Sequence, residues 1–408
     1  MVFLIDTILG LAALAALALG VLVLVQSLVA VVMPANDDKD LDEGEVPSFV
    51  VLVPAHDEAA GIEPVVHGLI EQVEAAGEAK GRLVVIADNC TDDTAALARG
   101  AGAEVLERND PEHRGKGYAI AFGLEALAES PPDVVVLVDA DCHFEIPTGI
   151  RRLVAAAERK QSPIQAQYVL TPPEDPSPKT RISAFAVVFK NVVRTRGMAL
   201  LNLPVPLLGS GMAFPYALLR QAPATEGYLV EDMLIGLELA KLGKPPVFLE
   251  SVRVTSPLPT GEEAANRQRR RWEHGHLETI QKNGIPTFVQ GVKTQSVPVS
   301  LMALDLMIPP LALFIVLLVG LMLVTLVWSL FGSGYPLRLA FYALMAVGFG
   351  ATAGWLKFGL DVLPPSDIGH VARYIAWKLP LYKTFFAQGS HQSWERTTRD
   401  GDPPESPK

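Results

Sequence analysis

Three long stretches without a charged residue set the limits for how this chain of 408 residues can fold. The first covers residues 7–36, and its apolar part, residues 8–33, can cross a hydrocarbon core of about 30 Å at about 1.5 Å per residue. The second and third cover residues 306–335 and 339–356. Hydrophobic residues make up 50% of the chain, and these stretches hold the excess. The sequence therefore predicts three membrane spans around a domain-sized segment of mixed polarity.

This pattern divides the chain into a series of segments. We expect an N-terminal transmembrane helix in residues 1–36, an acidic linker in 37–47, a cytosolic domain in 48–284, an interfacial segment in 285–300, two transmembrane helices in 301–363, an interfacial amphipathic helix with a cytosolic tail in 364–399, and a disordered tail in 400–408.

Lysine and arginine placement predicts the orientation of the spans. The residues before the first span carry neither type, whereas the central domain and the tail after Lys357 carry many. We expect the N-terminus outside and the domain and C-terminal tail inside the cell membrane. The first span lacks the positive n-region of a signal peptide and is longer than the usual ~7–15 apolar residues, so we expect it to remain as an anchor.

Cysteine content and net charge exclude some classes of protein. The two cysteines, Cys90 and Cys142, form no CxxC pair, which predicts free thiols in a reducing compartment and no zinc site. The net charge of −11, without a dominant basic face, argues against a nucleic-acid partner. Few polar residues interrupt the spans apart from Gln26 and Asp305, which disfavours a small transporter. We expect Asp305 to be interfacial rather than buried.

The central segment alternates between short β-rich runs and helical sequence. Apolar runs at residues 49–53, 83–87 and 134–138 have the length and composition of buried strands, and helical stretches separate them. Such alternation is typical of βαβ units and a mainly parallel sheet, which is an α/β fold.

Acidic residues directly follow two of these strands. Asp88 follows the second, and Asp139 and Asp141 follow the run at 134–138. Ligands of open α/β sheets bind at the carboxyl ends of the strands, and hard divalent cations prefer oxygen ligands. The alternative for each group is a turn or a helix cap, because aspartate also favours those positions.

A second pair of motifs lies farther along the chain. Glu231 and Asp232 offer a carboxylate that could act as a general base, although an acidic pair also stabilises a helix N-terminus. Residues 268–272 read Gln-Arg-Arg-Arg-Trp, in which an arginine can bind diphosphate oxygens in bidentate fashion. A basic patch facing anionic lipid is the alternative for this segment.

In order and context these motifs resemble those of membrane-bound family 2 glycosyltransferases of the cellulose- and hyaluronan-synthase-like kind. The resemblance covers roughly residues 48–280 and rests on a DxD motif at 139–141, an ED motif at 231–232 and QxxRW at 268–272. It implies a GT-A nucleotide-diphospho-sugar transferase domain with a mixed, mainly parallel sheet. It also implies a metal-dependent, inverting glycosyltransferase that uses Mg²⁺ or Mn²⁺.

The resemblance also implies roles for individual residues. Asp141 would coordinate the metal, Asp139 would contact the ribose or the metal shell, and Asp232 would be the general base. Glu231, Gln268, Arg271 and Trp272 would bind the acceptor or the diphosphate, and Ala55, Glu58, Asp88 and Lys116 would bind the nucleotide. Cys90 stands where the family usually has Ser or Gly.

The partners implied are a nucleotide-sugar donor, most simply a UDP-sugar, a glycan or lipid-linked acceptor, and membrane lipids, with a function in exopolysaccharide or cell-envelope glycan synthesis. Three spans are fewer than processive synthases carry, so an export partner or a homo-oligomer would be needed for a channel. Two alternatives remain: a non-processive enzyme acting on a polyprenyl phosphate or a glycolipid, and an inactive nucleotide-sensing membrane protein.

Overall fold

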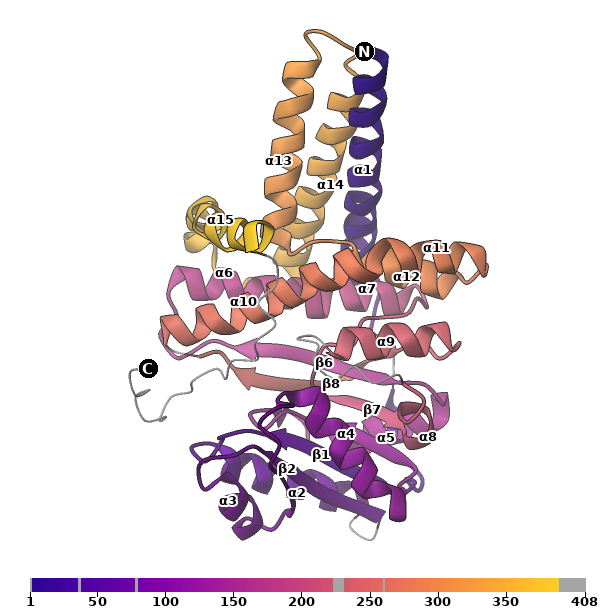
Figure 1. The fold of residues 1–408 in the computed structure, drawn as a ribbon, viewed down its shortest axis with the longest axis vertical. Helices are drawn as coiled ribbons and strands as arrows, with labels where there is room; N and C mark the ends of the chain where they lie inside the picture. The colour runs from indigo at the N-terminus through magenta and orange to yellow at the C-terminus, as the bar shows by residue number, and fades with distance from the viewer. Residues whose placement is uncertain (1, 36–37, 78–79, 223–230, 260, 389–408) are drawn as a thin grey trace. The chain divides into compact units, whose positions relative to one another are not determined.

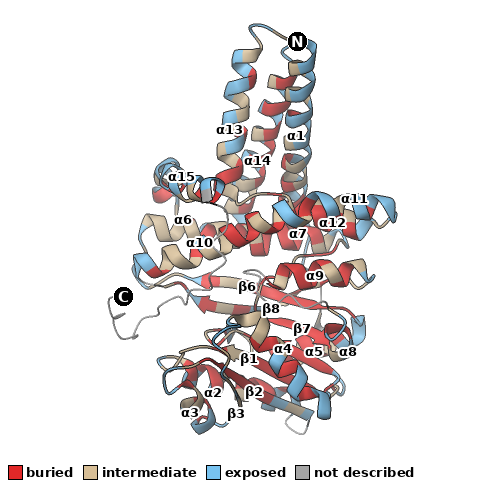
Figure 2. Cartoon of the chain, in the orientation of Figure 1, coloured by how far each residue is buried: buried red, intermediate tan, exposed pale blue. Residues whose placement is uncertain are grey.

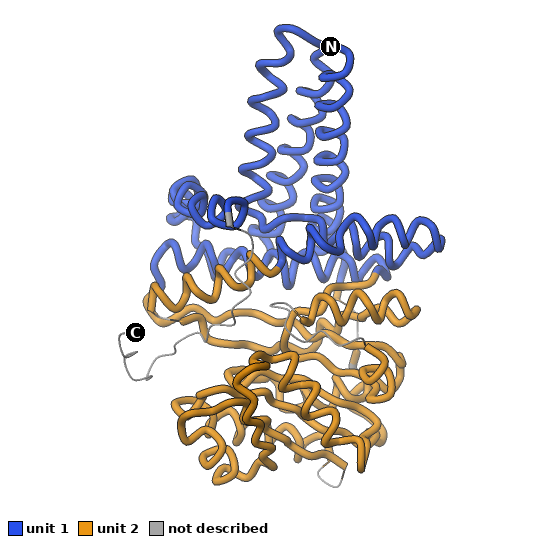
Figure 3. Tube along the Cα trace, in the orientation of Figure 1, with its two compact units in different colours: residues 1–34, 176–203, 276–389 blue, residues 35–175, 204–275, 390–408 orange. Residues whose placement is uncertain are grey.

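The computed structural model describes residues 2–35, 38–77, 80–222, 231–259 and 261–388. The chain forms two compact units, and each is built from separated segments (Figure 3). Unit 1 contains residues 1–34, 176–203 and 276–389, and the described residues of unit 2 fall within 35–175 and 204–275. Residues 176–203 thus fold with the apolar helices, although they lie inside the segment 48–284 predicted as one domain. The predicted tail at 400–408 is outside the described residues.

Unit 2 is an α/β domain around an eight-stranded sheet of described residues with the order β3-β2-β1-β4-β7-β6-β8-β5 (Figure 1). Pairings β3-β2, β2-β1, β1-β4 and β6-β8 are parallel, and the other three are antiparallel, so the predicted mixed, mainly parallel sheet is confirmed. The elements are η1 Lys39–Asp42, β1 Phe49–Ala55, α2 Ile62–Gly77, β2 Gly81–Asp88, α3 Thr94–Gly100, β3 Glu104–Arg108, α4 Lys116–Ala126, η3 Leu127–Glu129, β4 Val134–Leu137, β5 His143–Phe144, α5 Gly149–Lys160, β6 Ile164–Thr171, β7 Met212–Pro215, α8 Tyr216–Leu219, α9 Glu231–Lys241 and β8 Val247–Pro257, followed by α10 Glu262–Thr279.

Helices cover both faces of this sheet because its central strands are apolar on both sides. Alternate residues of a strand point to opposite faces. Leu52 and Ile86 face α4, in which Gly123 leaves no room for a Cβ atom beside Ile86, and Ile235 of α9 joins the same core. Phe49 faces the opposite side, where it packs with Val73 of α2 around Gly81. Buried residues accordingly concentrate along the strands (Figure 2).

Among the described residues, unit 1 contains three helices that are long and apolar enough to cross a membrane: α1 Val2–Val32, α13 Leu311–Trp328 and α14 Tyr335–Phe358. Their outer faces expose large apolar side chains such as Phe3, Leu323 and Phe349, which suits contact with lipid (Figure 2). The remaining elements are α6 Pro178–Val188, the π-helical turn η4 Phe189–Arg194, α7 Thr195–Leu200, the π-helical turn η5 Ile280–Gly284, α11 Ile285–Lys293, α12 Val297–Leu306, η6 Pro365–His370 and α15 Val371–Gln388.

Small residues let α1 approach its neighbours closely. A Cβ atom on Gly20 would lie 2.9 Å from the carbonyl oxygen of Ala343 in α14, and one on Gly197 of α7 would lie 2.0 Å from the carbonyl oxygen of Gln26. Small side chains at helix contacts are typical of membrane helix packing, because they allow backbones to touch. Helix α1 therefore packs closely on both α14 and α7.

A buried polar cluster joins three segments of unit 1. Gln26 donates a hydrogen bond to Asp305 Oδ1 at 2.7 Å, and Arg194 donates to the same oxygen at 2.6 Å and to Gln26 Oε1 at 3.0 Å. The expectation that Asp305 is interfacial is therefore wrong: its residue exposure is 9%. Burial is tolerated because a guanidinium pairs with the carboxylate and an amide completes its hydrogen bonds.

Candidate functional site

Two predicted carboxylates lie at the carboxyl end of β4, where the chain leaves the sheet. Asp139 forms an ion pair with Lys116 Nζ, and the same ammonium donates to the carbonyl oxygen of Gly209 at 2.5 Å. Lys116 is the first residue of α4, which follows β3. The ion pair therefore joins the N-terminus of α4 to the carboxyl end of β4. The Asp139 carboxylate holds the pKa of Lys116 above its ordinary value although burial opposes this, and the lysine stays charged.

Asp141 lies beside Asp139 and is positioned by β8. Ser256 donates to Asp141 Oδ2 at 2.7 Å, and the buried Cys142 thiol donates to Asp141 Oδ1 at 3.6 Å. Burial, together with the Asp141 and Asp139 carboxylates, raises the pKa of the Cys142 thiol well above its usual range. The sulfur is therefore a neutral thiol unless a metal binds it.

The donor set fits a hard divalent cation. Ligand atoms of Asp139, Asp141 and Cys142 all lie within 4.8 Å of one another. The carboxylates of Asp139 and Asp141 offer the oxygen ligands that hard cations prefer, and Mg²⁺ is commonly held by one or two carboxylates together with water and substrate phosphates. The geometry suits such an ion better than zinc, which favours thiolate and imidazole ligands.

Glu231 and Asp232 form the first turn of α9 and lie on the same site. A Cβ atom on Gly209 would be 3.4 Å from Asp232 Oδ2 and 4.0 Å from Lys116 Nζ, so the Asp232 carboxylate approaches the backbone that Lys116 binds. Burial raises the pKa of Glu231 to about 7, and Lys116 opposes the shift while Asp232 adds to it. Glu231 is thus partly protonated near neutral pH. The preceding residues, 223–230, lie outside the described part of the chain.

Hydrogen bonds from Gln165 of β6 hold the loop that carries Gly209 and Ser210. The fully buried Gln165 side chain accepts from the Leu208 N–H at 2.7 Å and donates to the Ser210 carbonyl oxygen at 2.9 Å. Ser210 Oγ in turn accepts from the Asp139 N–H at 3.0 Å and donates to Cys142 Sγ at 3.1 Å. Gln165 therefore fixes the backbone against which Asp139 and Lys116 are placed.

Asp88, at the end of β2, is buried and paired with an arginine that sequence reasoning missed. Arg108 Nη1 donates to Asp88 Oδ1 at 2.6 Å, and Arg108 Nη2 donates to Asp110 Oδ2 at 3.0 Å. The imidazole of His56 lies 2.6 Å from the Asp88 carbonyl oxygen. The signal for Arg108 was available, because it is the last residue of β3 and β3 pairs in parallel with β2.

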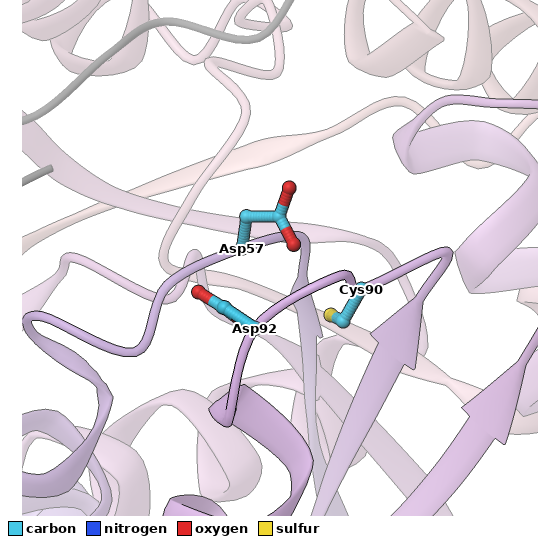
Figure 4. A group of neighbouring side chains, drawn as sticks. All are labelled: Asp57, Cys90 and Asp92. Atoms are coloured by element: carbon cyan, nitrogen blue, oxygen red, sulfur yellow. The ribbon is translucent and has the colours of Figure 1, made fainter. Parts of the chain in front are cut away.

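Two aspartates and a cysteine form a second cluster in the loops after β1 and β2: Asp57, Cys90 and Asp92 (Figure 4). Asp57 accepts from the Thr91 N–H at 2.6 Å, and Asp92 accepts from the Ala59 N–H at 3.1 Å. Burial raises the pKa of Cys90 to about 11, and the two carboxylates add to this. These hydrogen bonds tie the loop that follows Ala55 to the loop that follows Asp88. Glu58 lies in that first loop, and its N–H donates to Thr94 Oγ1 at 2.7 Å.

Gln268, Arg271 and Trp272 lie on α10 at positions i, i+3 and i+4, and they therefore share one helix face. All three are partly buried, whereas Arg270 is exposed. The structure gathers Lys116, Asp139, Asp141, Glu231 and Asp232 at one place.

Comparison with known proteins identifies the domain that carries these residues. Residues 47–275, more than half of the chain, match the family described as glycosyltransferase like family 2. The chain belongs to this family. It is therefore a glycosyltransferase, as predicted. No curated protein sequence matches the chain.

One solved structure agrees with this family at the level of the fold. A mannosyltransferase from Pyrobaculum calidifontis, solved in complex with GDP-Man and Mn²⁺, has a TM-score of 0.55 and 16% identity over 93% of this chain and 98% of its own. A glucosyl-3-phosphoglycerate synthase from Mycobacterium tuberculosis, solved with Mn²⁺, UDP and glucosyl-3-phosphoglycerate, has a TM-score of 0.40 and 24% identity over 60% of this chain and 85% of its own. The first of these supports the GT-A fold predicted for the family 2 domain.

Proposed function

We propose that this family 2 glycosyltransferase is membrane-bound and transfers a sugar from a nucleotide-sugar donor to a glycan or lipid-linked acceptor, with inversion at the anomeric carbon. The observation that carries the proposal is the convergence of Lys116, Asp139, Asp141 and the Glu231–Asp232 turn at one edge of the sheet. One lysine and two carboxylates suit a diphosphate and its cation, and a further carboxylate beside them suits proton abstraction.

In this scheme, Asp139 and Asp141 would hold Mg²⁺ or Mn²⁺, which would neutralise negative charge on the leaving diphosphate. Lys116 supplies further positive charge at the same edge. Asp232 accepts the proton of the acceptor hydroxyl. The hydroxyl oxygen of the acceptor forms a bond to the anomeric carbon of the donor while the bond from that carbon to the diphosphate breaks. A single displacement of this kind inverts the configuration, and the scheme contains no protein nucleophile.

Glu231 has a supporting part in the proposal. Because its pKa is about 7, Glu231 holds a proton for part of the time, and this lowers the repulsion that two adjacent carboxylates would feel. Asp232 then remains the carboxylate that removes the acceptor proton. Ala55, Glu58 and Asp88 are proposed to lie along the nucleotide, and Gln268, Arg271 and Trp272 to bind diphosphate or acceptor.

The three apolar helices support a multi-pass location in the cell membrane. The excess of lysine and arginine in the central domain and in the tail after Lys357 favours a cytoplasmic location for both. We place the enzyme in exopolysaccharide or cell-envelope glycan synthesis, close to the cellulose- and hyaluronan-synthase-like group. A lipid acceptor that carries a phosphate is the second candidate, because the catalytic unit is joined to only three candidate spans within the described residues.

Donor turnover by the purified full-length protein tests this proposal. Membrane-reconstituted enzyme with Mn²⁺ or Mg²⁺ is offered UDP-sugars and, in view of the Pyrobaculum enzyme's ligand, GDP-mannose. We expect metal-dependent nucleotide release from one donor, reduced at least about 100-fold in Asp141→Ala. Asp93→Asn is the matched control, because this aspartate caps α3 without a side-chain hydrogen bond.

Asp232→Asn separates the two classes of acceptor. A hydroxyl acceptor needs a base, so the variant should lose turnover to a similar extent, whereas a phosphate acceptor is already ionised and would leave substantial activity. Absence of release from every donor, with folded protein and both kinds of acceptor supplied, would refute the enzymatic scheme in favour of a nucleotide sensor.

A further inference from the structure

Helix α15 in unit 1 is basic and aromatic and contains no acidic residue. Its sequence, residues 371–388, includes Arg373, Lys378 and Lys383 as its only charged residues. It also exposes large apolar side chains, with Leu379 46% and Phe386 63% exposed. A helix of this composition is typical of the interface between a bilayer and water.

Packing within unit 1 fixes the depth of α15 relative to the spans. Tyr382 and Phe385 of α15 pack on Leu313, which lies in the first turn of α13, and Figure 1 draws α15 across that end of the helix. Helix α13 has 18 residues and is about 27 Å long. Its whole length is therefore needed to cross a hydrocarbon core of about 30 Å. Leu313 therefore lies at the edge of the core, and α15 lies at the level of the lipid headgroups.

At this level α15 and α6 bring two lysines onto aromatic rings. Lys179 Nζ of α6 lies 3.5 Å from the ring centroid of Trp377, and Lys378 Nζ lies 5.0 Å from that of Tyr374. Lys378 and Tyr374 are only 4% and 5% exposed. Such contacts hold the two ammonium groups over the aromatic rings.

The Tyr374 hydroxyl is a second sign of a binding site. The oxygen is buried and has no hydrogen-bond partner among the described residues, although a buried hydroxyl normally has one. A hydroxyl can donate to an anion. The nearby acid Asp367 is paired with Arg181 at 2.9 Å, so its charge is already balanced.

We propose that Lys179, Tyr374 and Lys378 bind the headgroup of an anionic phospholipid from the surrounding bilayer. The lysines supply positive charge, the hydroxyl of Tyr374 donates to a headgroup phosphate, and the depth of α15 brings the site to the headgroups. The inference rests on the proposed membrane location of the three spans and is independent of the glycosyl donor.

Lipid retention by the full-length protein tests the site. The protein is placed in nanodiscs of equal parts phosphatidylglycerol and phosphatidylcholine, released, and examined by native mass spectrometry for bound lipid. We expect preferential retention of phosphatidylglycerol, lowered about five-fold by either Lys179→Gln or Lys378→Gln, the factor that corresponds to one lysine near an anionic surface. Tyr374→Phe, which keeps the ring and its packing, should also lower the preference.

Lys383→Gln is the matched control, because it removes the same charge from an exposed position on the same helix. It should keep the preference. Equal retention of the two lipids by the inserted wild-type protein, or an equal loss in Lys383→Gln and Lys378→Gln, would overturn the site. Failure of the protein to enter nanodiscs would refute the membrane location and the site together, while donor turnover by the full-length protein would still be measurable.

Discussion

The ionisation of Glu231 should appear in the pH dependence of stability. Its pKa rises from 4.5 to about 7 on folding, so the native state binds more protons than the unfolded state between these pH values. Glu231 therefore stabilises the fold below about pH 4.5, and this contribution is lost as the pH rises through 7. We expect the thermal midpoint of wild type to fall relative to that of Glu231→Gln between pH 5 and 8. Parallel curves for the two proteins would contradict this assignment.

Replacing Gln165 should lower turnover as well as stability. Gln165→Leu leaves the buried Leu208 N–H and Ser210 carbonyl without their side-chain partner, and each such loss costs about 1–3 kcal/mol. Because the loop also places Lys116 and Asp139, we expect kcat to fall about ten-fold or more.

Gln167→Leu is the control for this prediction. Gln167 lies on the same strand, is 7% exposed and bonds to Glu250 and Arg253 instead of the loop. The two variants should lose similar stability, measured by thermal unfolding, while only Gln165→Leu loses turnover. Equal kcat values in the two variants would show that Gln165 is merely structural.

At the scale of elements, the close contact between α1 and α7 should be sensitive to a single methyl group. Gly197→Ala would place Cβ 2.0 Å from the Gln26 carbonyl oxygen, and a backbone atom cannot move away as a flexible side chain can. We expect destabilisation of about 1–3 kcal/mol or more, seen as a lower thermal midpoint in nanodiscs.

Gly68→Ala provides the contrast, because nothing lies within 4 Å of its added Cβ in helix α2. Alanine there should be neutral or stabilising by up to about 1 kcal/mol. A midpoint in Gly197→Ala equal to that of wild type would mean that α1 and α7 separate in solution.

The strands of the domain and its acidic edge could be predicted from sequence because their signals are local. An apolar run such as 134–138 specifies its own strand, and Asp139 and Asp141 follow it directly. Asp305 and Gln165 carried no such signal: their surroundings come from residues far away in sequence, Arg194 and Leu208. The assignment of residues 176–203 to unit 1 has the same cause, since packing on α1 rather than local pattern decides it.

At the scale of the whole molecule, the orientation in the membrane can be tested with cysteine labelling. The two native thiols should react slowly with maleimide, because the pKa of Cys90 is about 11 and that of buried Cys142 is also raised. Gly334→Cys, in the loop between α13 and α14, should react with a membrane-impermeant maleimide on intact cells. Asp93→Cys should react only after permeabilisation. The reverse pattern would invert the proposed topology.

The cluster of Gln26, Arg194 and Asp305 also has a consequence for the order of events during synthesis. Gln26 leaves the ribosome 279 residues before Asp305, a delay of about 14–56 s at about 5–20 residues per second. Until then Gln26 and Arg194 lack the carboxylate that joins them, so the first span cannot reach its final packing. A chain that stops before residue 305 would keep Arg194 without the carboxylate that pairs with it, which is costly for a buried charge.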